Sequence, residues 1–239
     1  MSKSSKLIRP LVPSVPGASR RAQYSASTKR ALVEVAEELF TEHGYSGTSL
    51  DAIVAGAQVT KGALYHHFSG KQALFEAVFE RVETAASKHI HKAIKGNRDP
   101  WEKSLRGLRA FLEVVQQPEY RRVVIQDGPA VLGYERFREQ EERSTFANVL
   151  DIVESVISAG TWELEPDMME TFTRIFFGAM SAAGESVATS DDPRAAGARV
   201  ETAVGFILAG LRTLVEQGVE LPTPAFDEPE VGDDEDEAG

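Results

Sequence analysis

The chain of 239 residues contains no cysteine, which excludes disulfide scaffolds, thiolate metal sites and cysteine nucleophiles. It also lacks any apolar run that approaches the roughly 18 residues needed to span a bilayer. The N-terminus has no apolar stretch of the kind found in secretory signals. Segments that alternate apolar and polar residues are missing too, so no β-strand is predicted. We therefore expect a cytoplasmic protein with no membrane segment.

Each end of the chain lacks charge of one sign. Residues 1–26 contain five basic residues and no acidic one, whereas residues 219–239 contain nine acidic residues and no basic one. The first segment mixes prolines with serines, and the second ends in the run DDEDE. Neither segment has enough apolar side chains to form a core. We predict a disordered basic arm over 1–26 and a disordered acidic tail over 219–239, so the net charge of −11 says little about partners.

Between these ends the apolar residues recur with the period of a helix. Ala36 and Phe40, for example, share one face of a helix that Gly44 would stop. Pairs such as Asp-Pro supply a cap and a first helical residue for later helices. The pattern predicts an all-α fold of about nine helices without strands. We divide it into a three-helix N-terminal domain over 27–74 and a larger helical domain over 75–218.

Two short helices are predicted within residues 48–68, separated by a turn over 56–59. Thr48 can cap the first helix and Thr60 the second, which is the layout of a helix-turn-helix. The second helix would present small residues to base edges, together with side chains that donate hydrogen bonds to phosphates or bases. The next helix would start near the same surface and add an anion site at its N-terminus. The predicted DNA-binding residues are Thr48, Ser49, Thr60, Lys61, Gly62, Ala63, Tyr65, His66 and Lys71.

The run from Thr28 to Leu74 resembles the DNA-binding domain of the tetracycline-repressor (TetR) family. The resemblance is carried by Leu39-Phe40, Gly44-Tyr45, Thr48-Ser49, Val59-Thr60-Lys61-Gly62, Leu64-Tyr65-His66-His67-Phe68 and Lys71. The family usually has glycine where this chain has Gln58, and a left-handed backbone there would cost about 1 kcal/mol. The resemblance implies a homodimeric regulator, usually a repressor, that binds double-stranded operator DNA and is released by a small-molecule effector. It also implies that Tyr65 and Lys71 contact phosphates and that residues 60–63 read bases.

If the protein is such a regulator, the second half must hold an effector pocket. Its aromatic and methionine side chains could line that pocket or could only form the core, which is the more frequent role of an apolar helical face. The candidates are Trp101, Phe111, Tyr120, Tyr134, Phe137, Trp162, Met168, Phe172 and Phe176. The adjacent residues His66 and His67 diverge by about 100° on a helix and cannot chelate one ion together. We predict no catalytic residue, metal site or cofactor, and hence no enzyme.

Small residues are unusually dense in the last two predicted helices. Glycine inside a helix costs roughly 1 kcal/mol relative to alanine, so its presence there indicates close helix approach. Two such helices from each of two chains would form a four-helix bundle about a two-fold axis, although close packing within one subunit is an open alternative. The predicted interface residues are Gly178, Ala182, Val204, Ile207, Leu208 and Leu211. An alternative function is that of a DNA-architectural or interaction protein without an effector, which would need no internal pocket.

Overall fold

The computed structural model describes residues 16–160 and 162–220, which form ten α-helices and one π-helix and contain no strand. This confirms the predicted all-α class. None of the described helices has the length and apolar character needed to cross a membrane. The elements are α1 (Pro16–Gly47), α2 (Leu50–Gly56), α3 (Lys61–His67), α4 (Lys71–Ile94), α5 (Pro100–Val114), η1 (Tyr120–Asp127), α6 (Gly128–Leu132), α7 (Tyr134–Ser144), α8 (Phe146–Ile157), α9 (Pro166–Ala188) and α10 (Pro193–Glu216).

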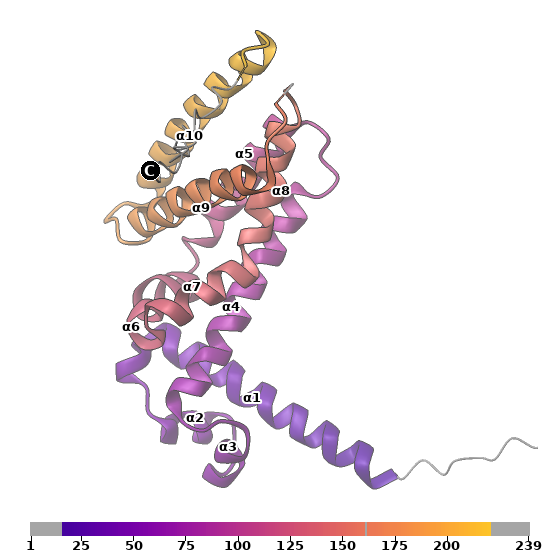
Figure 1. Cartoon of the computed structure of the whole chain (residues 1–239). Coiled ribbons are helices and arrows are strands. Elements are labelled where there is room, and N and C mark those ends of the chain that lie inside the picture. The colour runs from indigo at the N-terminus through magenta and orange to yellow at the C-terminus, as the bar shows by residue number, and fades with distance from the viewer. Residues whose placement is uncertain (1–15, 161, 221–239) are drawn as a thin grey trace, which may run out of the picture.

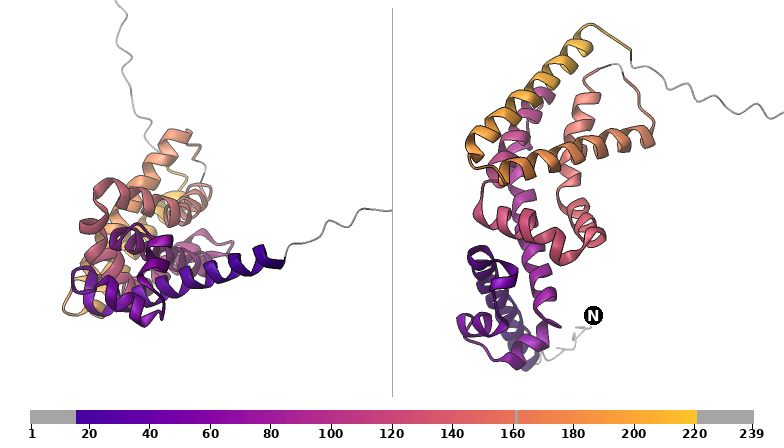
Figure 2. Two further views of the ribbon diagram at one scale, coloured as in Figure 1. Left: turned by 90° about the horizontal axis from the view of Figure 1, so that it is seen from below. Right: turned by 90° about the vertical axis from the view of Figure 1, so that its left-hand side faces the viewer.

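The molecule is elongated, with α2 and α3 at one end and α10 at the other (Figure 1). Helix α4 starts beside the short helices and runs into the larger helical part, so it belongs to both (Figure 1). In the second part, α9 and α10 lie side by side and α8 packs against α9 (Figure 2). The polypeptide therefore connects its two ends through one continuous helix.

Helix α1 begins earlier than the sequence predicted. Residues 16–26 were expected to belong to a disordered arm, but they form the first turns of α1. Pro16 suits the first helical position, and the alanines and arginines that follow are strong helix formers, so a helix is locally favoured here. The remainder of the predicted arm, residues 1–15, and residues 221–239 of the acidic tail lie outside the described residues.

Gly44 interrupts α1 near its end, as the sequence predicted. Its φ of +72° lies in the left-handed region, which favours glycine. A Cβ atom at this position would lie 1.8 Å from Nη2 of Arg122. The backbone conformation therefore favours glycine, and any larger residue would also displace the Arg122 guanidinium group.

Three aromatic rings form the centre of the core that joins the short helices to α4. The Phe75 ring lies edge-on to the Phe40 ring, with centroids 5.3 Å apart, and to the Tyr45 ring, with centroids 5.2 Å apart. Ile53 of α2 and Leu64 of α3 are buried in the same cluster. The helix-turn-helix is thus packed on residues that α4 provides, which fixes its orientation relative to the larger part.

We expect replacement of Phe75 by alanine to lower the free energy of unfolding by about 3–5 kcal/mol, because this fully buried ring would leave a cavity beside Phe40. The midpoint of urea denaturation, with the m-value checked, measures this loss. Tyr24→Ala is a matched control, since that ring is 77% exposed on α1 and its removal should cost less than about 0.5 kcal/mol. Equal losses in the two variants would contradict the assigned core.

Candidate nucleic-acid interface and ligand cavity

Side-chain caps define both helices of the helix-turn-helix. The Ser49 hydroxyl oxygen accepts a hydrogen bond from the Ala52 N–H at 3.1 Å, and the Thr60 hydroxyl oxygen accepts from the Ala63 N–H at 3.2 Å. Gln58, in the turn between them, has a φ of +55°. This is the left-handed conformation that the sequence comparison anticipated for a position usually occupied by glycine.

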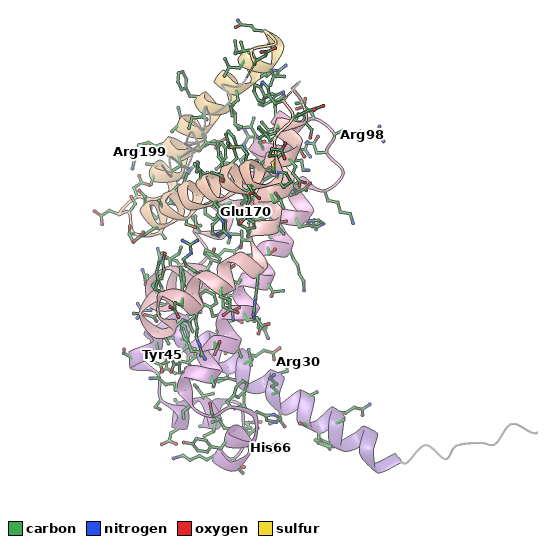
Figure 3. The ribbon with its side chains drawn as sticks, viewed as in Figure 1. Arg30, Tyr45, His66, Arg98, Glu170 and Arg199 are labelled. Atoms are coloured by element: carbon green, nitrogen blue, oxygen red, sulfur yellow. The ribbon has the colours of Figure 1, made fainter. Side chains whose placement is uncertain are left out.

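The outer face of α3 is open to solvent. Lys61, Gly62, Tyr65 and His66 are exposed, and Tyr65 is 58% exposed. A Cβ atom at Gly62 would meet nothing closer than 3.8 Å, so another molecule can approach the backbone there. His66 lies at the end of the molecule opposite Arg199 (Figure 3). The predicted surface therefore stands at the tip of the protein, free of the larger helical part.

Lys61 forms an ion pair with Asp51 of α2 at a distance of 2.5 Å between Nζ and Oδ1. The hydrogen bond and the charge of Asp51 raise the pKa of Lys61, so its ammonium group is fully charged at neutral pH. Both side chains are exposed. Any phosphate or base contact by Lys61 must therefore exchange the carboxylate for a DNA group.

Two predicted DNA-binding residues form hydrogen bonds with backbone carbonyl oxygens of the protein. Thr48 is only 3% exposed, and its hydroxyl lies within hydrogen-bonding distance of the carbonyl oxygens of Leu39 and Gly44. Lys71 directs its ammonium group to the carbonyl oxygens of Tyr45, at 2.6 Å, and Thr48, at 2.8 Å. The break at Gly44 leaves carbonyl groups without helical partners, and these two side chains supply the missing donors. The structure thus corrects the cap predicted at Thr48, because Ser49 caps α2, whereas the DNA contacts of Thr48 and Lys71 stay predictions.

A cavity of about 400 Å³ lies in the larger helical part, between α5, η1, α8, α9 and α10. Of the predicted pocket residues, the structure places Phe111, Tyr120, Phe137, Phe172 and Phe176 in its lining. The other four, Trp101, Tyr134, Trp162 and Met168, are not part of the lining. Tyr134 is 73% exposed, and the Trp162 indole N–H donates to the carbonyl of Val219 within a separate apolar cluster.

Sequence reasoning missed the polar members of the lining. These residues are Ser104, Thr145, Asn148, Ser181 and Glu185. They come from α5, from the residue between α7 and α8, from α8 and from α9. Residues 145 and 148 are three positions apart at the start of an apolar helix. That spacing is too common in helices to indicate a ligand site, so these polar residues had no usable signal in the sequence.

The structure divides the predicted dimer residues between two surroundings. Ala182, Val204, Leu208 and Leu211 line the cavity, which therefore reaches between α9 and α10. Gly178 is exposed and Ile207 is 50% exposed. The set was chosen by helical spacing, which does not distinguish the side of a helix that faces a cavity from the side that faces solvent.

A short chain of contacts connects the cavity to the end of α1. Tyr120 and Ile125 of η1 line the cavity, and Asp127 ends the same π-helix. The Asp127 carboxylate accepts a hydrogen bond from the Tyr45 N–H at 2.7 Å and lies 3.3 Å from Nε of Arg122. Tyr45 has a free N–H because Gly44 interrupts the helix before it. A displacement of η1 at the cavity must therefore act on the segment that precedes α2.

Comparison with known proteins assigns both parts of the chain. Residues 32–78 match the family described as bacterial regulatory proteins, tetR family, and residues 101–211 match the tetracyclin repressor-like C-terminal domain. The chain belongs to the TetR family. It is therefore a helix-turn-helix transcriptional regulator of that family.

TetR-family relatives differ in how much of the chain they match. The Tn10 TetC protein of Escherichia coli is 47% identical over 55 residues, which cover 23% of this chain and 28% of TetC. The transcriptional regulator YhgD of Bacillus subtilis is 25% identical over 138 residues, which cover 57% of this chain and 72% of YhgD. The match thus covers less than a third of the length of TetC but nearly three quarters of YhgD.

Solved structures match over more of the fold. A TetR-family regulator from Pectobacterium atrosepticum is 29% identical, with a TM-score of 0.69, and the match covers 80% of this chain and 96% of that one. RolR in complex with resorcinol has the same fold, with 21% identity, a TM-score of 0.60, and coverage of 85% of this chain and 99% of RolR.

We expect Tyr65→Ala to weaken binding to all duplexes about tenfold, because it removes one hydrogen bond to a phosphate, equivalent to about 1.4 kcal/mol. The variant should leave the salt dependence unchanged, since no charge is lost. Fluorescence anisotropy with a fragment selected from genomic DNA and with an unrelated duplex measures both effects. Tyr134→Ala is the control, because that exposed tyrosine lies on α7, and equal affinities for the two variants would show that α3 is wrongly oriented.

Proposed function

We propose that this TetR-family protein is a repressor that binds a palindromic operator as a homodimer and leaves it when a small, largely apolar effector occupies the cavity. The protein would act in the cytoplasm, where its DNA target lies. The observation that carries the proposal is the pair of contacts through η1, which lines the cavity at Tyr120 and binds the end of α1 at Asp127.

The cavity favours this function over that of an architectural DNA-binding protein. An architectural protein has no use for an internal cavity of about 400 Å³, whereas this volume lies within the range of small-molecule sites. Lining by aromatic side chains with a few polar groups is typical of such sites. RolR, a protein of the same fold, binds resorcinol, so a small aromatic effector is compatible with this architecture.

Exposed apolar residues on α9 and α10 support the dimer. Ile175, Phe206, Ile207 and Leu214 are large apolar residues that solvent reaches, and Phe206 is 82% exposed. Clusters of this kind mark surfaces that are covered by a partner. A second copy of the chain is the partner we propose, because two recognition helices related by a two-fold axis can read the two halves of a palindrome.

Selection of bound fragments from genomic DNA with the purified protein tests the operator. We expect a palindrome whose half-sites are separated by about one helical turn or a multiple of it.

Phe206→Glu should convert the dimer to a monomer in sedimentation velocity and abolish tight binding to this fragment, because the charge would be buried in the interface. Tyr134→Glu, on the exposed face of α7, should remain dimeric. A Phe206→Glu variant that stays dimeric would place the interface elsewhere.

We expect Asp127→Ala to bind the operator but to lose much of its response to effector, because the variant removes the contact between η1 and Tyr45. In the wild type, a compound found by thermal-shift screening should raise the operator Kd by about 5- to 150-fold, the usual range of allosteric coupling. In Asp127→Ala that factor should approach one. Glu135→Ala, an exposed acid on α7, should respond like the wild type, and a full response in Asp127→Ala would assign the coupling to α4 alone.

A further inference from the structure

The charged groups near the cavity restrict the class of its ligand. The described lining contains no lysine, arginine or histidine, and Glu185 is its one charged residue. Lys103 is a neighbour of the lining residue Ser104, but its ammonium group binds the Asp151 carboxylate and the Ser155 hydroxyl, each at 2.7 Å. A carboxylate or phosphate in the cavity would lose its hydration without gaining a cation, which is strongly unfavourable. The ligand is therefore not an anion.

Asn148 gives the cavity a hydrogen-bond acceptor of fixed orientation. The residue is 5% exposed, and its Nδ2 donates to the carbonyl oxygen of Ser87 at 3.0 Å and to the Ser87 hydroxyl at 3.1 Å. A carbonyl oxygen can only accept, so this contact decides which end of the amide faces α4. Among the described residues no donor reaches Oδ1, and Asn148 is part of the cavity lining. Oδ1 is thus a buried acceptor that a ligand donor can satisfy.

Two other polar lining residues have already used their hydroxyl hydrogens within the protein. Ser104 donates to the carbonyl oxygen of Pro100 at 2.7 Å, and Thr145 donates to the Glu83 carboxylate at 2.9 Å. Each hydroxyl has one hydrogen, so in this arrangement neither can donate to a ligand. Asn148, Ser104 and Thr145 therefore match a ligand that brings a hydrogen-bond donor of its own.

From these observations we propose that the cavity binds a neutral aromatic alcohol whose hydroxyl group donates to Oδ1 of Asn148. The assignment rests on the proposed function, which makes this cavity the effector site. Phenylalanine rings from three sides, Phe111, Phe137 and Phe172 among them, provide the edge and face contacts that an aromatic ring favours. A hydroxyl donor then satisfies Oδ1 of Asn148, an acceptor in the lining to which no described residue donates.

The same amide links ligand recognition to the helix that carries the DNA-binding end. Asn148 and Thr145 lie one turn apart at the start of α8, and their partners Ser87 and Glu83 lie one turn apart on α4. A ligand bonded to Asn148 therefore acts on a side chain that is itself fastened to α4. In this proposal Asn148 both binds the hydroxyl group of the ligand and holds α8 to α4.

Three compounds of the same shape test the ligand class on the full-length wild-type protein. They are 2-naphthol, a neutral donor; 2-methoxynaphthalene, which has no donor; and 2-naphthoate, an anion. Isothermal titration calorimetry should show 2-naphthol binding at least about tenfold more tightly than 2-methoxynaphthalene, because the latter leaves Oδ1 unsatisfied. Binding of 2-naphthoate should be weaker still. The proposal is overturned if the first two compounds bind equally, if 2-naphthoate binds most tightly, or if 2-naphthol does not bind.

Variants assign the preference to Asn148. In Asn148→Leu the preference for 2-naphthol should fall to about twofold or less, and an unchanged preference contradicts the assigned acceptor. Ser87→Ala is the matched control, since it keeps the carbonyl acceptor of Nδ2 and should retain the preference. If Asn148→Leu does not fold, the comparison of the three compounds on the wild type still decides the proposal.

Binding of the unliganded protein to its selected operator fragment is measured in parallel. Failure to bind a palindrome contradicts the proposed function and leaves the ligand class standing. Tight binding of 2-naphthol without any change in operator affinity likewise contradicts effector release only.

Discussion

The hydrogen bond from the Tyr45 N–H to the Asp127 carboxylate is the contact on which the arrangement of the two parts depends. It exists because Gly44 breaks α1 and releases a backbone donor at the point where η1 approaches. The same break exposes carbonyl oxygens, and Lys71 binds one of them from the first turn of α4. One interruption of a helix thereby supplies both a donor for the larger helical part and acceptors for the helix that connects the two parts.

Local signals predicted the N-terminal part well, because its structure is determined by residues close in sequence. Gly44 ends the regular helix, Thr60 caps α3, and Gln58 takes the left-handed conformation that a short turn requires. The exposed positions of Lys61 and Tyr65 follow from the same helical spacing. The cap of α2 was predicted at Thr48 but is formed by Ser49, because the Thr48 hydroxyl instead contacts backbone carbonyls that become available where the chain bends.

The cavity was harder to predict, since its lining comes from helices far apart in sequence. Spacing shows that Phe111 and Phe176 lie on apolar faces, but it does not show which faces remain unfilled after packing. Leu208 and Val204 illustrate the same difficulty: their spacing indicates an apolar face, and only the structure shows that this face reaches the cavity. Asn148 gave no signal, because its importance depends on the contact with Ser87 across the helix pair.

The ion pair between Lys61 and Asp51 has a consequence for the search for a target site. On DNA of any sequence, a phosphate must displace the Asp51 carboxylate from Lys61 before it can pair with the ammonium group. Non-specific binding therefore gains less free energy from Lys61 than from a lysine without such a partner. At the correct sequence, base contacts add to the exchange and offset the loss of the carboxylate. A genome offers millions of competing sites, so for a regulator of the proposed kind, weaker binding to all of them would shorten the time spent away from the operator.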